Sequence, residues 1–271
     1  MDQLILALEE CDFVNEPVCV PGDVAELFVF PDIVGQVNRT VFLIFLAAAI
    51  VVGLLYFAFR RPSLVPSKFQ ASIESLVGVV RNDIAVGIIG PEGLKYFPYL
   101  LSIFLFILVG NLFEITPLIN FPITSRMAIP LFLALVTWVI FLFVGIRKQG
   151  MKYFGELLWP PGVPTGLKPL VGVIEFVSTI LVRPFSLAVR LFANLVAGHV
   201  MLSLLLVTGW IFISNLVTNY GEIGLKGFAG FAWFGLGLGI WVFELLVAVL
   251  QAYIFTLLSA VYIESSIHPA H

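Results

Sequence analysis

Five long hydrophobic segments restrict what this 271-residue chain can fold into. They occupy 41–59, 96–113, 127–146, 169–208 and 228–263. A helix needs about 20 apolar residues to cross a bilayer. The composition agrees, because 60% of the residues are hydrophobic, 11% are charged and the mean hydropathy is +1.07, whereas soluble chains are roughly a quarter charged. The sequence therefore predicts an all-α integral membrane protein whose single membrane domain, 41–271, crosses the bilayer five times.

The last two segments are too long for a helix that stands upright in the membrane. At ~1.5 Å per residue the segment 228–263 would be roughly 50 Å long, a mismatch that modest tilt does not absorb. Each segment is therefore either two shorter helices or one steeply tilted helix. Pro184 is able to kink the first segment, whereas only glycines interrupt the second. We expect a long, strongly tilted hairpin.

Two less hydrophobic segments surround the first span. Residues 1–40 are acidic and rich in proline, which predicts a loop-like segment. This segment holds both cysteines, Cys11 and Cys19, without a CxxC pair or a nearby histidine, so no zinc site is expected. They are either two unrelated thiols or a local disulfide, and a disulfide requires an oxidising compartment. The amphipathic stretch 63–90 predicts an interfacial helix, with a loop facing solvent as the alternative.

Positive charges give the orientation of the chain, since short cytoplasmic loops are rich in lysine and arginine. The loops after the first and third spans, together with the residue before the second, hold nine such residues: Arg60, Arg61, Lys68, Arg81, Lys95, Arg147, Lys148, Lys152 and Lys168. The opposite side holds three: Arg39, Arg126 and Lys226. We therefore expect the N-terminus outside and the C-terminus in the cytoplasm. The few, scattered basic residues do not support nucleic-acid binding.

Polar residues inside the fourth segment need an explanation. The stretch RPFSLAVRLFANLVAGH, 183–199, lies within almost pure hydrocarbon, where one Arg costs about 2.5–3.5 kcal/mol on insertion scales. Arg183 is near enough to the cytoplasmic end to reach the interface, but Arg190 lies deeper. Asn194 follows one turn later on the same face, and His199 points to the opposite side of the helix. Glu175 lies near the cytoplasmic end of the same segment.

The final segment supplies partners for these residues. Glu244 and Gln251 are seven residues apart and share a helix face. In an antiparallel hairpin Gln251 reaches the level of Arg190, and Glu244 reaches the level of His199. These groups are either structural ion pairs and hydrogen bonds or a proton route. Histidine titrates near neutral pH, whereas Arg190 keeps its proton and would block a leak between two halves of such a route.

These motifs resemble subunit a of the rotary F-type ATP synthases. In that family a proline precedes an RLFxN motif, a polar residue follows nine positions after the arginine, and a QAxxF motif lies in the last helix. They are present here as Pro184, Arg190 to Asn194, His199 and Gln251-Ala252. The resemblance covers most of the chain beyond residue 40. It implies one transmembrane helix, a surface helix, a hairpin and a long tilted hairpin that curves along a ring of c-subunits.

The resemblance also implies a function, the stator proton channel of the F0 sector. Arg190 would face the c-ring carboxylate with Asn194 and Gln251 nearby, His199 and Glu244 would form the outer half-channel, and Glu175 would belong to the inner one. Asn111 and Glu114, at the outer end of the second span, are weaker candidates for the outer entrance.

The expected partners are the c-ring, the peripheral-stalk b subunits, other ATP synthase subunits and lipids. We expect no cofactor, no metal and no bond chemistry on ATP, because the sequence lacks a GxxxxGK[ST] loop. The expected location is the bacterial plasma membrane, with the mitochondrial inner membrane as the alternative. A proton-coupled secondary transporter is the alternative function, although the chain shows neither the repeats nor the broken helices typical of that class.

Overall fold

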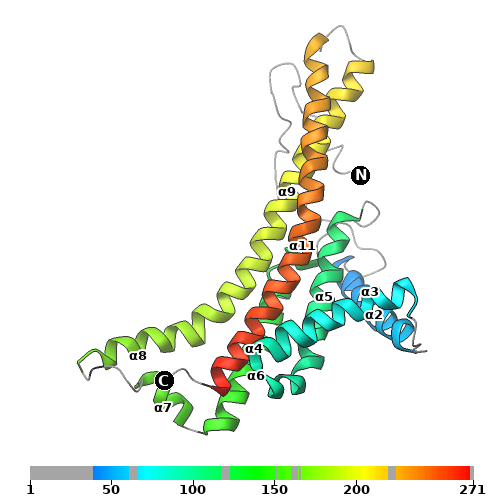
Figure 1. Ribbon diagram of the computed structural model, residues 1–271. Coiled ribbons are helices and arrows are strands. Elements are labelled where there is room, and N and C mark those ends of the chain that lie inside the picture. Colours follow the sequence, from blue (N-terminus) through cyan, green and yellow to red (C-terminus); the bar gives the residue numbers. More distant parts are fainter. Residues whose placement is uncertain are drawn as a thin grey trace. The chain divides into compact units, whose positions relative to one another are not determined.

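The computed structural model describes residues 39–60, 66–116, 123–150, 152–159, 164, 166–218 and 224–268. Every regular element in these ranges is a helix (Figure 1). Five stretches are long and apolar enough to cross a membrane: α2 (Arg39–Phe59), α5 (Phe97–Ile115), α6 (Ala128–Gln149), Lys168–Thr218 and Lys226–Ile267. The predicted all-α membrane fold with five spans is therefore confirmed. Cys11, Cys19 and residues 1–38 lie outside the described ranges, so the disulfide and the N-terminal segment stay predictions.

The fourth and fifth spans each form one continuous helical run. The fourth consists of α8 (Lys168–Val177), the π-helical turn η5 (Ser178–Val182) and α9 (Arg183–Thr218). The fifth consists of the short η6 (Gly224–Phe228) and the 39-residue α11 (Ala229–Ile267). Of the two alternatives for these long segments, two separate short helices each or one long run each, the structure has the long run.

Pro184 does not break the fourth span, because the preceding turn widens. Proline lacks an N–H, and its ring would clash with the carbonyl four residues earlier. The Arg183 N–H donates to the Ser178 carbonyl, which is the wider hydrogen bond of a π-turn. The chain curves through this turn between α8 and the first residues of α9 (Figure 1). The expected kink is therefore present, and it is spread over residues 178–182 instead of interrupting the helix.

Both long helices extend beyond the expected ends, 208 and 263. The segment after 208 contains polar residues that satisfy their hydrogen bonds within the helix. Ser214 Oγ and Asn215 Nδ2 both donate to the Ile211 carbonyl, and Thr218 Oγ1 donates to the Ser214 carbonyl. At the end of α11, two serine hydroxyls bond to the Tyr262 carbonyl in the same way. Polar residues of this kind lower the hydropathy without ending a helix.

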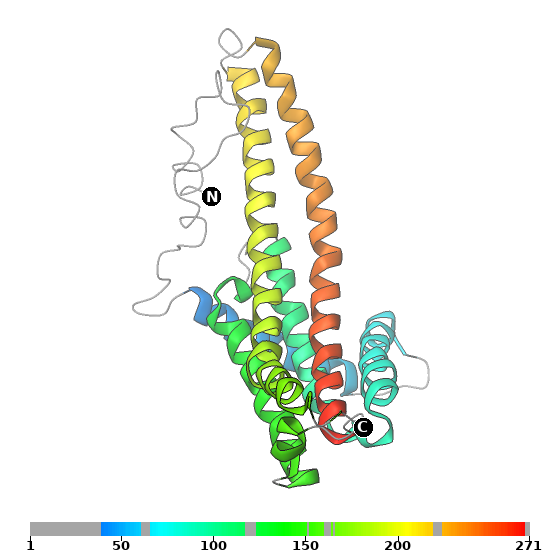
Figure 2. The same ribbon diagram turned by 90° about the vertical axis from the view of Figure 1, so that its left-hand side faces the viewer.

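The chain divides into two compact units. In the described residues, unit 1 comprises 39–45, 110–116, 123–125, 193–218 and 224–249, and unit 2 comprises the remaining described residues. Within unit 1, the second part of α9 and the first part of α11 run side by side, as both views show (Figures 1 and 2). This antiparallel hairpin carries His199 and Glu244, two of the three buried titratable residues described below.

Glycines let the two helices of this hairpin approach closely. A Cβ atom added at Gly209 would lie 2.6 Å from the Phe234 backbone nitrogen, and one at Gly230 would lie 2.8 Å from the Phe212 Cβ. A Cβ at Gly237 would lie 2.6 Å from Leu206. Small residues permit such close backbone contact between membrane helices. Of the glycines that interrupt the last segment, Gly230 and Gly237 are therefore packing positions in the hairpin, whereas a Cβ atom added at Gly235 or Gly239 would meet nothing within 4 Å.

The surface segment between the first two spans is helical and amphipathic. It consists of α3 (Lys68–Gly78), the π-helix η2 (Val79–Val86), α4 (Gly87–Ile89) and the 3-10 helix η3 (Pro91–Lys95). Ser67 caps its start by accepting the Gln70 N–H. Its buried face carries Ile73, Val80 and Ile84, and its exposed face carries the run Arg81, Asn82 and Asp83. This pattern fits a helix that lies along an interface, and its membrane position stays a prediction.

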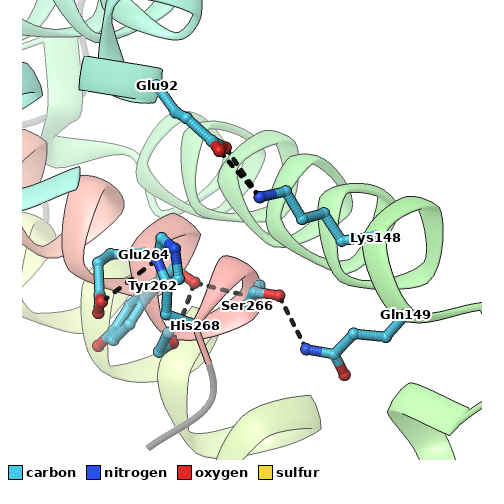
Figure 3. A network of polar contacts seen from close by, with 8 residues as sticks. Glu92, Lys148, Gln149, Tyr262, Glu264, Ser266 and His268 are labelled. Carbon is cyan, nitrogen blue, oxygen red and sulfur yellow. Dashed lines mark hydrogen bonds and ion pairs between the residues drawn. The ribbon is translucent and has the colours of Figure 1, made fainter. Parts of the chain in front are cut away.

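One exposed ion pair joins this segment to α6 within unit 2. The Lys148 Nζ lies 2.9 Å from Glu92 Oε2 and donates a hydrogen bond of 3.1 Å to Oε1 (Figure 3). This hydrogen bond, and then the positive charge of Lys148, lower the pKa of Glu92 from its ordinary value of 4.5. Since the folded-state pKa is lowered, the stabilisation is present above pH 4.5 and is lost as the pH falls through the folded-state value.

The substitution Lys148→Met should therefore return the pKa of Glu92 toward 4.5. The measurement is a ¹³C carboxyl NMR titration of the labelled subunit at low salt, because salt screens exposed pairs. Lys95→Met is the matched control, since Lys95 contributes only the smallest of the effects on Glu92. An unchanged Glu92 titration in the Lys148 variant would show that the pair does not persist in solution.

Candidate functional site

A cluster of three titratable side chains lies buried in unit 1. Glu114 comes from α5, His199 from α9 and Glu244 from α11, and their exposed fractions are 3%, 1% and 6%. The His199 Nδ1 lies 3.9 Å from Glu114 Oε1, which is within the range of an ion pair and longer than a hydrogen bond. Ionisable groups within membrane-spanning helices are costly and typically mark ion or proton pathways.

The carboxylate of Glu244 rests against the backbone of α9. A Cβ atom added at Gly198 would overlap both oxygens of this carboxylate. The missing side chain of Gly198, the residue before His199, leaves the space in which the Glu244 carboxylate lies. The expectation that Glu244 reaches the level of His199 agrees with this contact. Glu244 also lies close enough to Glu114 for their charges to interact.

Polar contacts on either side of Glu114 tie the end of α5 to its neighbours. The Asn111 Nδ2 donates to the Ala248 carbonyl at 3.5 Å, and the Thr124 Oγ1 donates to Asn111 Oδ1 at 3.2 Å. The Trp241 Nε1 donates to the Ile115 carbonyl at 3.0 Å. Buried polar groups are normally paired in this way. Asn111 therefore belongs to the surroundings of the cluster and links α5 to α11.

The remaining predicted residues of the long helices differ in exposure. Arg190 and Asn194 are exposed on α9, four residues apart, whereas His199 on the same helix is buried. This matches the expectation that Arg190 and His199 point to opposite sides. In unit 2, Gln251 is buried with 4% exposure and Glu175 on α8 is half-buried. Glu244 and Gln251 are seven positions apart, which is about two turns of α11.

The sequence marks Glu114 only as a weaker candidate, and it does not single out Gly198, Trp241 or Thr124. One signal for Glu114 was available, because the spacing of Asn111 and Glu114 puts both on one helix face in an otherwise apolar span. No comparable signal marked Trp241, whose partner is a backbone carbonyl 126 residues away. Among the described residues, no group of three or more His, Cys, Asp and Glu side chains has an arrangement that could hold a metal ion.

The arrangement can move protons across part of a bilayer. Two carboxyl groups and an imidazole can each take up and release a proton, and they come from three helices that meet inside the hydrophobic span. The guanidinium of Arg190 is exposed on α9, and arginine is able to pair with an anionic group through its fixed positive charge. Of the three buried groups, His199 lies on α9, the helix that also carries the exposed Arg190.

Comparisons with known proteins identify the family of the chain. Residues 41–264 match the family model described as ATP synthase A chain. The chain is 42% identical to an ATP synthase subunit a from Frankia alni over 80% of this chain and 73% of that protein. It is 39% identical to the subunit a of Rhodococcus erythropolis over 86% of this chain and 83% of that protein. It is 38% identical to the subunit a of Rhodopseudomonas palustris over 83% of this chain and 86% of that protein. The match spans all five apolar helices, and the chain therefore belongs to the ATP synthase A chain family.

Proposed function

We propose that this chain conducts protons through two separate half-channels in a rotary ATP synthase and performs no bond chemistry itself. Family membership favours a multi-pass subunit of a bacterial membrane ATP synthase over a secondary transporter. The observation that carries the proposal is the buried cluster of Glu114, His199 and Glu244 at 1–6% exposure. Without a transport role, three titratable side chains buried inside membrane helices would only cost stability.

The cluster forms the outer half-channel. Glu114, His199 and Glu244 pass a proton between the extracytoplasmic side and a carboxyl group on a neighbouring c-subunit. Asn111 keeps the end of α5 against α11, so that the α5 carboxylate faces the other two groups. The N-terminus is extracytoplasmic and the C-terminus cytoplasmic, as the distribution of Lys and Arg predicts.

Arg190 separates this half-channel from the inner one. Its exposed guanidinium lies on an apolar helix surface, where a charge needs a partner of opposite sign. A deprotonated c-ring carboxylate supplies that partner, because opposite charges in a low-dielectric site favour the ionised form. Asn194 shares the exposed face with Arg190, and the buried Gln251 on α11 belongs to the same part of the proton path. Glu175 receives the proton on the cytoplasmic side, and the b subunits hold the chain against the turning ring.

Replacing Glu244 by Gln tests the outer half-channel. Glutamine keeps the shape of the side chain but cannot ionise, so ATP-driven proton pumping should fall by about tenfold or more. Pumping is measured by vesicle acidification, and the amount of subunit in the purified complex is measured in parallel. Glu264→Gln is the control on the same helix, because Glu264 is half-exposed and pairs with His268 at 3.9 Å (Figure 3). Normal pumping by the Glu244→Gln complex would contradict the proposed path.

A further inference from the structure

Two polar contacts bracket the buried carboxylates of unit 1. Trp241 Nε1 donates to the Ile115 carbonyl at 3.0 Å, and Asn111 Nδ2 donates to the Ala248 carbonyl at 3.5 Å. On α11 the two contacts are seven residues apart, which is about two turns, with Glu244 between them. On α5 the same contacts enclose Glu114. The two helices are therefore antiparallel here, and the contacts bring both carboxylates to one level.

The Trp241 contact is the better defined of the two. The last carbonyls of a helix lack partners within the helix, and Ile115 is the final residue of α5 and only 6% exposed. Its carbonyl would be a buried acceptor without the indole donor. The ring also comes from the same face of α11 as Glu244, since the two residues are three apart. Fixing the end of α5 at this point fixes the neighbouring residue, Glu114.

We propose that Trp241 is a positioning residue that, through its hydrogen bond to the Ile115 carbonyl, holds the Glu114 carboxylate at the level of Glu244. This proposal rests on the proposed channel function and goes beyond it. The indole itself takes no part in proton transfer, because its N–H does not ionise in proteins. Its effect is geometric, and it reaches the proton path only through Glu114.

The test is a double-mutant cycle in the complete ATP synthase complex. Trp241→Phe keeps an aromatic ring and removes only the donor. It should lower ATP-driven pumping roughly three- to tenfold, the effect expected for the loss of one neutral hydrogen bond. If Trp241 acts through Glu114, the same substitution should have little further effect in a Glu114→Gln background, because residues in one network are not additive. The subunit content of the purified complex should stay unchanged. Trp233→Phe, two turns earlier on α11, is the matched control.

Normal pumping by Trp241→Phe would overturn the proposal. The proposal would also be wrong if Trp241→Phe lowered pumping by the same factor in the Glu114→Gln background, because the tryptophan would then have a purely structural role. If Trp241→Phe does not assemble, Trp241→Met enters the same cycle, because its flexible side chain fills part of the space of the ring and has no hydrogen-bond donor. Normal pumping by both Glu114→Gln and Glu244→Gln would instead overturn the channel itself, a result that the tryptophan variants cannot produce.

Discussion

Replacing Arg190 by Ala should abolish ATP-driven proton pumping, with a loss of about a hundredfold or more, because a fixed charge that stabilises an ionised group in a dry site commonly contributes that much. Without the guanidinium, a ring carboxylate between the half-channels would keep its proton, and the two half-channels would no longer be separated. Pumping is measured as acidification of inverted vesicles that carry the whole complex. Passive proton leak under an imposed gradient is measured separately and should rise.

Arg183 provides a matched control for this experiment. It lies seven residues earlier on α9, and the structure gives it a local packing role. Its guanidinium lies 5.3 Å from the centre of the Tyr262 ring and donates to Ser265 Oγ at 3.3 Å. Arg183→Ala should therefore affect assembly more than pumping per assembled complex. If Arg190→Ala pumps at a near-normal rate while ATP hydrolysis is intact, the arginine is structural and the separation of half-channels is wrong.

A side chain at Gly198 should also disable the channel. The first carbon of any side chain there would overlap the Glu244 carboxylate, and the branched side chain of Val would displace the carboxylate from its position in the buried cluster. Gly198→Val should lower ATP-driven pumping by at least about tenfold, since small displacements of reacting groups are costly. The measurement is again vesicle acidification, corrected for the amount of assembled complex.

The matched control is Gly53→Val in α2, a spanning helix in which an added Cβ would meet nothing within 4 Å. A second control addresses the mechanism. Gly198→Ala combined with Glu244→Asp, which shortens the carboxylate side chain by one methylene, should pump better than Gly198→Ala alone. If Glu244→Asp does not restore pumping in the Gly198→Ala variant, and Gly198→Val pumps normally, the contact between the Glu244 carboxylate and the α9 backbone has no role in proton conduction.

Much of this protein follows from local properties of its sequence. The five spans are predictable because crossing a bilayer requires about 20 apolar residues in a row. This apolar length is a property of each segment by itself and does not depend on the rest of the chain. The opposite directions of Arg190 and His199 are predictable because their spacing fixes an angle on one helix. The helix ends were harder to predict. Ser214, Asn215 and Thr218 look like the start of a loop, but they bond within the helix.

Which residues meet in the buried cluster depends on contacts between segments that are far apart in the sequence. The sequence by itself determined the membrane class, the five spans and the presence of Arg190, His199 and Glu244 in the long helices. Only the tertiary structure brought Glu114 beside His199 and placed Trp241 over the end of α5. Periodicity gives the face of each helix but not its height or rotation against a neighbour. That register is set by close contacts, such as Gly198 against Glu244 and Gly209 against Phe234, which form only when the helices pack.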